Sequence, residues 1–170
     1  MARSYADDPI LLEMFRYWDR KRGGRAMPAR RDLDPTEIPK LLPHLRITEI
    51  IEGGRRFRYR LVGTAIVEAF GSDFTGKYVD ELYSPERAAA IESNYRRVCA
   101  EKRPIFRRSR YITLKGYDII ANRLLAPLSE NGREVDIVIA ALTFEFGSAL
   151  ERRIDPGAAA DPAADHLEIL

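Results

Sequence analysis

Residues 57–82 read FRYRLVGTAIVEAFGSDFTGKYVDEL, and the rest of the chain is best understood from this segment. The first five residues alternate aromatic or apolar side chains with arginines, which is the period of a half-buried β-strand. At Gly63 the apolar spacing becomes helical, and Gly76 interrupts it again. We expect a strand followed at once by short helices, an arrangement that forms a pocket wall over a sheet. Gly63 and Gly76 should lie where a side chain would clash or where φ is positive.

Helix and strand signals extend on both sides of this segment. The expected helices are 9–20, a short one after Asp34-Pro35, and 85–101, and the expected strands are 46–52, 57–62, 105–114, 117–128 and 135–146. The last strand, VDIVIAALTFEF, is apolar almost throughout, so it should lie in the centre of the sheet with both faces covered. Pro127, near the end of the preceding strand, indicates a bulge or a frayed end.

Composition limits the classes of protein that this chain can represent. At 170 residues it predicts one domain, organised as an N-terminal helix and basic loop (1–33), a main domain (34–147) and a flexible tail (148–170). The net charge of +2 gives no overall polyanion-binding character. The basic stretch 16–31 carries no recognisable DNA-reading motif, so a solvated loop is favoured over an anionic partner, and nucleic acid is not expected.

A cytoplasmic location is the expectation from two further features. Cys99 is the single cysteine, so an internal disulfide cannot form. The longest apolar run, 137–142, is far below the ~20 residues that span a bilayer, so no membrane association is expected.

The N-terminal helix carries a continuous apolar stripe. Asp8 and Pro9 suit its start. The stripe could pack on the protein's own sheet or on a second copy of the chain. We expect a homodimer in which this helix contributes to the contact. The expected interface residues are Leu11, Met14, Phe15 and Trp18.

Several short motifs occur together at a recognisable spacing. They are Trp18, Pro28 and Arg30, then DLDP at 32–35, RYRLVGT at 58–64, FTGK at 74–77 and Pro127-Leu128. With these motifs the sequence resembles the PAS domain superfamily, and within it the group labelled PAS_5, small stand-alone proteins of α-proteobacteria. The resemblance implies an α+β fold: a five-stranded antiparallel sheet of order 2-1-5-4-3, helices on one face around a cavity, and an N-terminal helix. It also implies sensing or protein-interaction roles.

The cofactors of such domains can be compared with the residues. A photoreactive flavin version needs a cysteine in the short helices, and 63–82 contains none. A haem version places a histidine in or beside the long helix, where this chain has none. His44 has no second ligand candidate nearby, so no metal is expected either. We predict no cofactor.

The inward positions of the strand and helices predict a pocket. The expected lining residues are Tyr59, Leu61, Phe70, Phe74, Tyr78, Ile91 and Tyr95. Arg60 and Arg123 are candidate anchors for a carboxylate or phosphate, unless both point to solvent. The bulky rings could instead fill the cavity, which would leave a pure protein-interaction module.

Enzyme signatures are lacking in the sequence. It contains no glycine-rich phosphate loop, HExxH motif or nucleophile elbow. The remaining enzymatic alternative is a small pocket enzyme of the ketosteroid-isomerase type, with Asp73, Asp80 or Asp118 as the general base. Each of these is equally well explained as a turn, cap or strand-face residue. We therefore expect no catalytic residue, and a sensory or regulatory domain that binds a small molecule, a signalling protein, or both.

Overall fold

The computed structural model describes residues 4–112, 118–146 and 166–169. Its helices are η1 (Tyr5–Asp7), α1 (Pro9–Arg22), η2 (Arg30–Asp32), η3 (Pro35–Glu37), η4 (Leu42–His44), η5 (Glu52–Gly54), α2 (Thr64–Phe70), α3 (Val79–Leu82) and α4 (Pro85–Glu101). Its strands are β1 (Leu45–Ile51), β2 (Arg56–Val62), β3 (Ile105–Ile112), β4 (Asp118–Leu128), β5 (Ile137–Phe146) and β6 (His166–Ile169). Within these ranges no helix is both long and apolar enough to cross a membrane.

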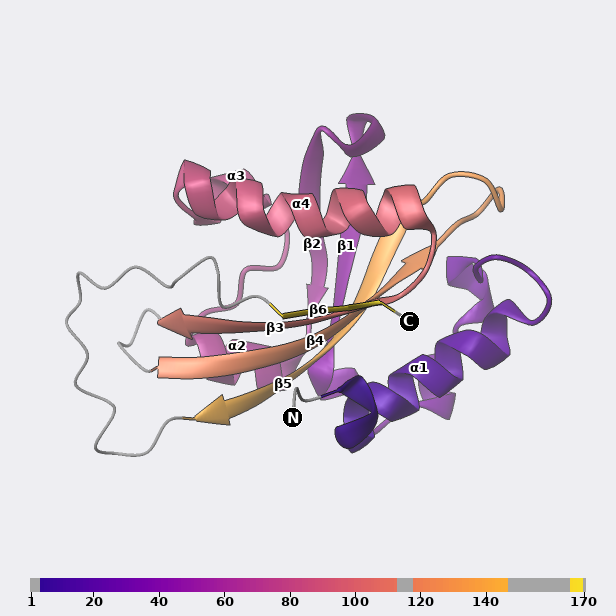
Figure 1. The fold of residues 1–170 in the computed structure, drawn as a ribbon, viewed down its shortest axis with the longest axis horizontal. Helices are drawn as coiled ribbons and strands as arrows, with labels where there is room; N and C mark the ends of the chain where they lie inside the picture. The colour runs from indigo at the N-terminus through magenta and orange to yellow at the C-terminus, as the bar shows by residue number, and fades with distance from the viewer. Residues whose placement is uncertain (1–3, 113–117, 147–165, 170) are drawn as a thin grey trace.

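The strands form one antiparallel sheet of order β2-β1-β5-β4-β3-β6 (Figure 1). The first five strands have the predicted order 2-1-5-4-3. The apolar strand β5 lies between β1 and β4, which confirms its expected central place. β6 pairs with the outer edge of β3, so 166–169, predicted as part of a flexible tail, extend the sheet.

Helices cover both faces of the sheet, with α2, α3 and α4 on one face and α1 on the other (Figure 1). Successive side chains of a strand point to opposite faces. On β1, Arg46 and Thr48 face α4, because both hydrogen bond to Tyr95 of that helix. On β5, the side chain of Thr143 points to the opposite face of the sheet. Its hydroxyl donates a hydrogen bond to Asp8, the residue that caps α1. We call the space between the sheet and α2–α4 the inner layer.

The helix α1 begins at the cap predicted from the sequence. The Asp8 carboxylate accepts hydrogen bonds from the backbone N–H groups of Ile10 and Leu11. The apolar stripe then packs on β4 and β5. Trp18 is buried there, and its Nε1 donates a hydrogen bond to the carbonyl oxygen of Pro127 at 2.8 Å.

This packing corrects the expected interface. Leu11, Met14 and Trp18 are buried within the chain's own core, so they have no surface to offer a second copy. Only Phe15 of the four residues is partly exposed, and its ring lies 5.2 Å from that of Tyr5. A homodimer contact through α1 would have to use Phe15 and the polar side of the helix.

The two glycines of the central segment are required for the expected reasons. Gly63 has an ordinary φ of −67°, but a Cβ placed on it would lie 2.3 Å from the carbonyl oxygen of Pro43. Gly76 has open space around it, but its φ is +84°. A clash and a positive φ therefore explain the two changes of chain direction.

Two local predictions were wrong. The expected helix after Asp34-Pro35 is a pair of separate 3₁₀ turns, η3 and η4, because Pro39 and Pro43 prevent a continuous α-helix. The β4–β5 register also runs without a shift through Pro127. The β3–β4 ladder ends at the pair Ile105–Leu125, so no strand lies beside Pro127 to need its missing N–H group.

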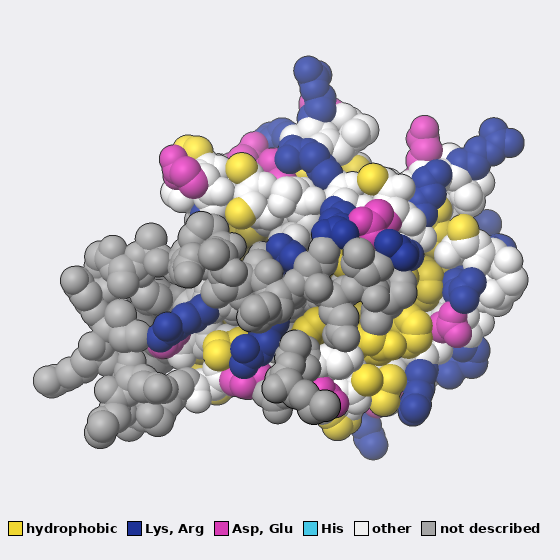
Figure 2. Space-filling model, in the orientation of Figure 1, with side chains coloured by type: hydrophobic (Ala, Val, Ile, Leu, Met, Phe, Trp, Pro, Cys, Tyr) yellow, Lys and Arg dark blue, Asp and Glu magenta, His cyan; other side chains and the backbone are white. Residues whose placement is uncertain are grey.

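The surface of the molecule is rich in basic side chains. Figure 2 shows Lys and Arg spread around one face, with hydrophobic side chains gathered between α4 and α1. Many of these arginines pair with a carboxylate, as Arg56 does with Asp80 and Arg97 with Glu101. The ion pairs of these surface arginines contrast with the surroundings of one buried arginine at the candidate functional site.

Candidate functional site

Aromatic side chains from β2, α2, α4 and the segment between α2 and α3 meet in the inner layer. The ring of Tyr59 lies 5.0 Å from that of Phe74, edge to face, and Phe57 stacks on Tyr95 at 5.1 Å. Phe70 is partly exposed and contacts Phe74 at 5.9 Å. Of the predicted lining residues, the structure thus brings Tyr59, Phe70, Phe74, Ile91 and Tyr95 to the inner layer, four of them buried.

Three other predicted pocket residues lie elsewhere. Leu61 is 42% exposed, because it occupies the edge strand on the side away from α4. Arg60 is exposed and forms an ion pair of 2.8 Å with Glu49. Tyr78 lies against the outer edge of β2, where the guanidinium carbon of Arg56 is 3.7 Å from its ring centre. The prediction that these three line the pocket is therefore corrected.

Arg123, the second candidate anchor, points inward. It is only 3% exposed and lies on the face of β4 that α4 covers. Its Nη2 donates to the hydroxyl of Ser109, and its guanidinium carbon is 5.3 Å from the ring centre of Tyr111. The alternative prediction, that these arginines point to solvent, is therefore correct for Arg60 and wrong for Arg123.

The polar centre of the inner layer joins two predicted residues, Tyr59 and Tyr95, to two that the sequence analysis missed, Arg46 and Thr48; these four are here called the Arg46 cluster. Arg46 is 4% exposed, and its Nη2 donates to the hydroxyl of Tyr95 at 2.9 Å. The Thr48 hydroxyl donates to the same oxygen at 3.1 Å. The guanidinium carbon of Arg46 also lies 4.8 Å from the ring centre of Tyr59.

Two atoms of this cluster are buried without a hydrogen bond partner in the part of the chain that the structure describes. They are Nε of Arg46 and the hydroxyl oxygen of Tyr59. In the same residues no carboxylate forms an ion pair with Arg46. A buried, unsatisfied polar group is rare and calls for an explanation such as a bound water, ion or ligand.

The electrostatics of the cluster keep Arg46 charged. Burial lowers the pKa of Arg46, but the surrounding tyrosine hydroxyls, Tyr95 first, raise it by more, so the net shift is upward. Burial also raises the pKa of Tyr59 well above its usual value, so its hydroxyl keeps its proton. The inner layer therefore holds a full positive charge beside neutral phenols.

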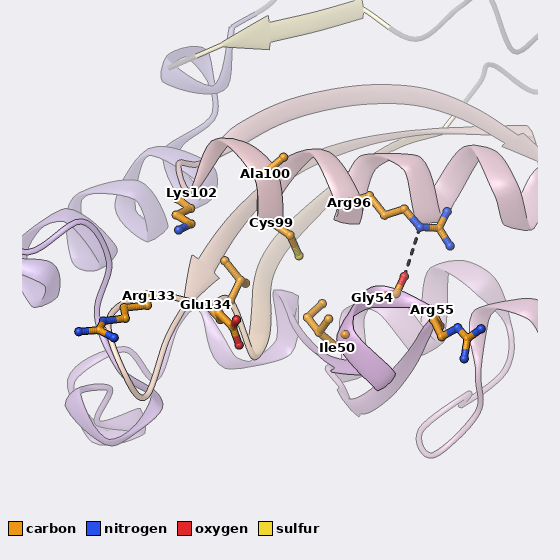
Figure 3. A pocket seen from close by; sticks show the side chains of 11 residues that line it. Ile50, Gly54, Arg55, Arg96, Cys99, Ala100, Lys102, Arg133 and Glu134 are labelled. Carbon is orange, nitrogen blue, oxygen red and sulfur yellow. Dashed lines mark hydrogen bonds between the residues drawn. The ribbon is translucent and has the colours of Figure 1, made fainter.

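A second concave site opens at the far end of α4, between the β1–β2 and β4–β5 hairpins (Figure 3). It has a volume of about 590 Å³ and is lined by Ile50, Gly53, Gly54, Arg55, Arg96, Cys99, Ala100, Lys102, Arg133, Glu134 and Val135. None of the predicted pocket residues is in that lining. Its basic side chains Arg55, Lys102 and Arg133 are exposed, so water solvates their charges at little cost.

Cys99 lies in the wall of this second pocket and not in the short helices. Burial raises the pKa of its thiol to about 11, with Arg96 acting weakly in the opposite direction. Arg96 itself is held by the carbonyl oxygen of Gly54 at 3.2 Å (Figure 3). A thiol with so high a pKa is a poor nucleophile at neutral pH.

The three aspartates of the enzymatic alternative occupy structural positions. Asp73 accepts hydrogen bonds from the hydroxyl and the N–H of Thr75, Asp80 pairs with Arg56, and Asp118 pairs with Arg110. These contacts lower the pKa of all three carboxyl groups. A general base in an apolar cavity needs the opposite shift. Within the described ranges no cluster of three acidic, histidine or cysteine residues could hold a metal ion either.

Comparison with known proteins places this geometry in a family. Residues 7–143 match the family model of the PAS domain. The Rhodobacter sphaeroides LOV protein is similar in structure, with a TM-score of 0.49 and 11% identity over 71% of this chain and 73% of that one. The RsLOV d2 variant gives 0.48 and 13% over 66% and 68%.

An RNA-binding light-oxygen-voltage receptor gives a TM-score of 0.45 and 16% identity over 69% of this chain and 35% of that one. No protein of curated function matches the sequence. The family match spans most of the chain, including α1, the inner layer and the first seven residues of β5, 137–143. The chain therefore belongs to the PAS domain family.

Proposed function

We propose that this protein is a non-catalytic sensory domain that binds a small molecule in the inner layer and passes its occupancy to a signalling partner. The observation that carries the proposal is the Arg46 cluster. It places a buried cation and a buried hydroxyl, both incompletely hydrogen bonded, in the layer between the sheet and α2–α4. A ligand in that layer would supply the missing partners.

A pure interaction module is the second candidate, and the ring packing favours it. Tyr59, Phe74 and Phe70 contact one another edge to face, and Phe57 covers Tyr95, so side chains fill much of the layer. Self-filling accounts for the apolar part of the layer. It does not account for Nε of Arg46, which a finished apolar core would not leave unsatisfied.

Native mass spectrometry of the protein purified from the cells that make it tests the proposal. We expect a retained non-peptide ligand of defined mass that is released when the protein is denatured. Protein refolded from denaturant serves as the ligand-free control. If the purified protein has the mass of the bare chain, and no metabolite in a screen raises the unfolding temperature of the refolded protein, the interaction module is the better description.

A further inference from the structure

We infer that the ligand of the inner layer is a small organic carboxylate, bound through its carboxylate to Arg46 with the hydroxyls of Tyr59 and Tyr95. This inference rests on the proposed function, because it names the chemical class of the molecule in the same site. The charge of Arg46, the hydrogen bond donors around it and the apolar surroundings each favour this class of ligand independently.

The charge of Arg46 is unusual for this chain. Several exposed arginines, which need a counter-charge least, have one: Arg58 and Arg60 share Glu49, and Arg110 pairs with Asp118. Arg46 is almost fully buried and needs one most, yet the described residues provide none. An uncompensated buried ion costs several kcal/mol, and arginine cannot lose its proton to avoid that cost. An anion from outside the chain would remove the penalty.

The hydrogen bond donors around Arg46 converge on one type of acceptor. Among the residues that the structure describes, Nε of Arg46 has no hydrogen bond partner, and the Tyr59 hydroxyl has only its interaction with Tyr95. The Tyr95 oxygen accepts from both Arg46 and Thr48, so its own proton is available to a ligand or to the neighbouring Tyr59 hydroxyl. A guanidinium edge together with phenol hydroxyls matches the two oxygens of a carboxylate, and hydrogen bonds to an ion are stronger than neutral ones.

The surroundings favour a carboxylate over a phosphate. Around the cluster lie Phe57, Phe74, Ile91 and Val138, all buried and apolar. A carboxylate carries one negative charge, equal to that of one guanidinium. A phosphate monoester carries nearly two at neutral pH, and the second would be desolvated in the same layer without a partner in the cluster. The apolar side chains suit an aliphatic or aromatic body.

We do not expect the charge of Arg46 to stabilise the fold. The guanidinium–ring contact with Tyr59 and the hydrogen bond to Tyr95 offset part of the burial cost, but both partners are neutral. Replacing a buried ion by an apolar side chain of similar size is often neutral or stabilising. Arg46→Met should therefore leave the ligand-free protein at least as stable as the parent.

The test uses refolded, ligand-free protein and two probe series of constant body: hexanoate, hexanamide and hexyl phosphate, and benzoate, benzamide and phenyl phosphate. Binding is read from the midpoint of thermal unfolding across a concentration series. We expect a carboxylate at 100 times its Kd to raise the parent midpoint by about 5–10 °C. The amide of equal size should bind much more weakly.

Variants then assign the effect to the cluster. Arg46→Met should reduce carboxylate affinity at least about 30-fold, and Tyr59→Phe by a smaller factor. Arg60→Met is the matched control: it removes an exposed arginine from the neighbouring strand, so affinity should be unchanged. The ligand retained in native mass spectrometry should itself contain a carboxylate.

The outcomes separate this inference from the proposed function. If amides bind as well as carboxylates, if only phosphates bind, or if the retained ligand has no carboxylate, the inference is wrong and small-molecule sensing stands. It is also wrong if ligand-free Arg46→Met is markedly less stable than the parent. If nothing is retained and no probe or metabolite shifts the midpoint, both proposals fail.

Discussion

Gly63→Ala should destabilise the protein through a clash of backbone with side chain. The added Cβ would lie 2.3 Å from the Pro43 oxygen, 2.6 Å from the Pro43 carbonyl carbon and 2.7 Å from the Leu42 oxygen. Real contacts of this kind begin near 3.0 Å, so η4 and the start of α2 must separate by at least 0.7 Å. All three atoms are backbone, so no flexible side chain can move aside.

Overpacking lowers the free energy of unfolding by about 1–3 kcal/mol. Because the neighbours of Gly63 are rigid backbone, we expect Gly63→Ala to cost about 2–3 kcal/mol, in the upper half of that range. For a chain of this size that lowers the midpoint of thermal unfolding by about 4–12 °C. Gly24→Ala is the matched control, because Gly24 has open space and no positive φ. Its midpoint should be unchanged or slightly raised.

Two measurements separate the clash from a conformational effect. Gly76→Val should cost about 1–3 kcal/mol through its positive φ, and Gly76→Asn should cost less, because asparagine tolerates that conformation. Gly63→Asn should show no such relief. If Gly63→Ala unfolds within about 0.5 kcal/mol of the parent in urea, the close approach to η4 is not a constraint on the fold and the reasoning is refuted.

Three further outcomes follow from contacts described above. Trp18→Phe should lose about 1–3 kcal/mol in urea unfolding, because the buried carbonyl oxygen of Pro127 loses its donor; an unchanged midpoint would mean that water replaces the indole. Cys99 should react with iodoacetamide at neutral pH roughly 100-fold more slowly than a free thiol, because burial raises its pKa to about 11; a rate close to that of free cysteine would contradict this. Burial raises the pKa of Glu49, but hydrogen bonds from two arginines lower it by more, so its stabilisation is present above about pH 4.3 and is lost as the pH falls through the lowered pKa. Glu49→Gln should therefore be less stable than the parent near neutral pH, with a difference that shrinks in acid; a constant difference across this range would show that Glu49 contributes by packing alone.

The sheet was largely predictable from the sequence, and its inner surface was not. The unbroken apolar run of β5 indicated a central strand, and the glycine changes of direction indicated short helices after β2. On β1, however, Ile47 is buried on one face of the sheet and its neighbours are buried on the other, because both faces are covered. Because both faces of β1 are buried, the alternation of side chains along the strand does not predict that Arg46 and Thr48 face α4.

The sequence left two partners open for the stripe on α1, the protein's own sheet and a second copy of the chain. Leu11, Met14 and Trp18 needed an apolar surface, and the sheet's second face was available for them. Assigning the stripe to that face would have left the arginine of β1 on the side of α4. Leu61 was misplaced for a related reason: an edge strand can expose an apolar residue that in a central strand would be buried.

Because helices cover both faces of the sheet, a truncation that removes α1 would expose apolar surface. A fragment that begins at residue 34 would lack α1 and would bare Leu124 and Ile139, two fully packed residues on the face that the helix covers. Exposed apolar surface of that kind joins copies of a protein to one another. Self-association of such a fragment would be a consequence of the missing helix. The oligomeric state of the protein should therefore be measured on chains that keep α1.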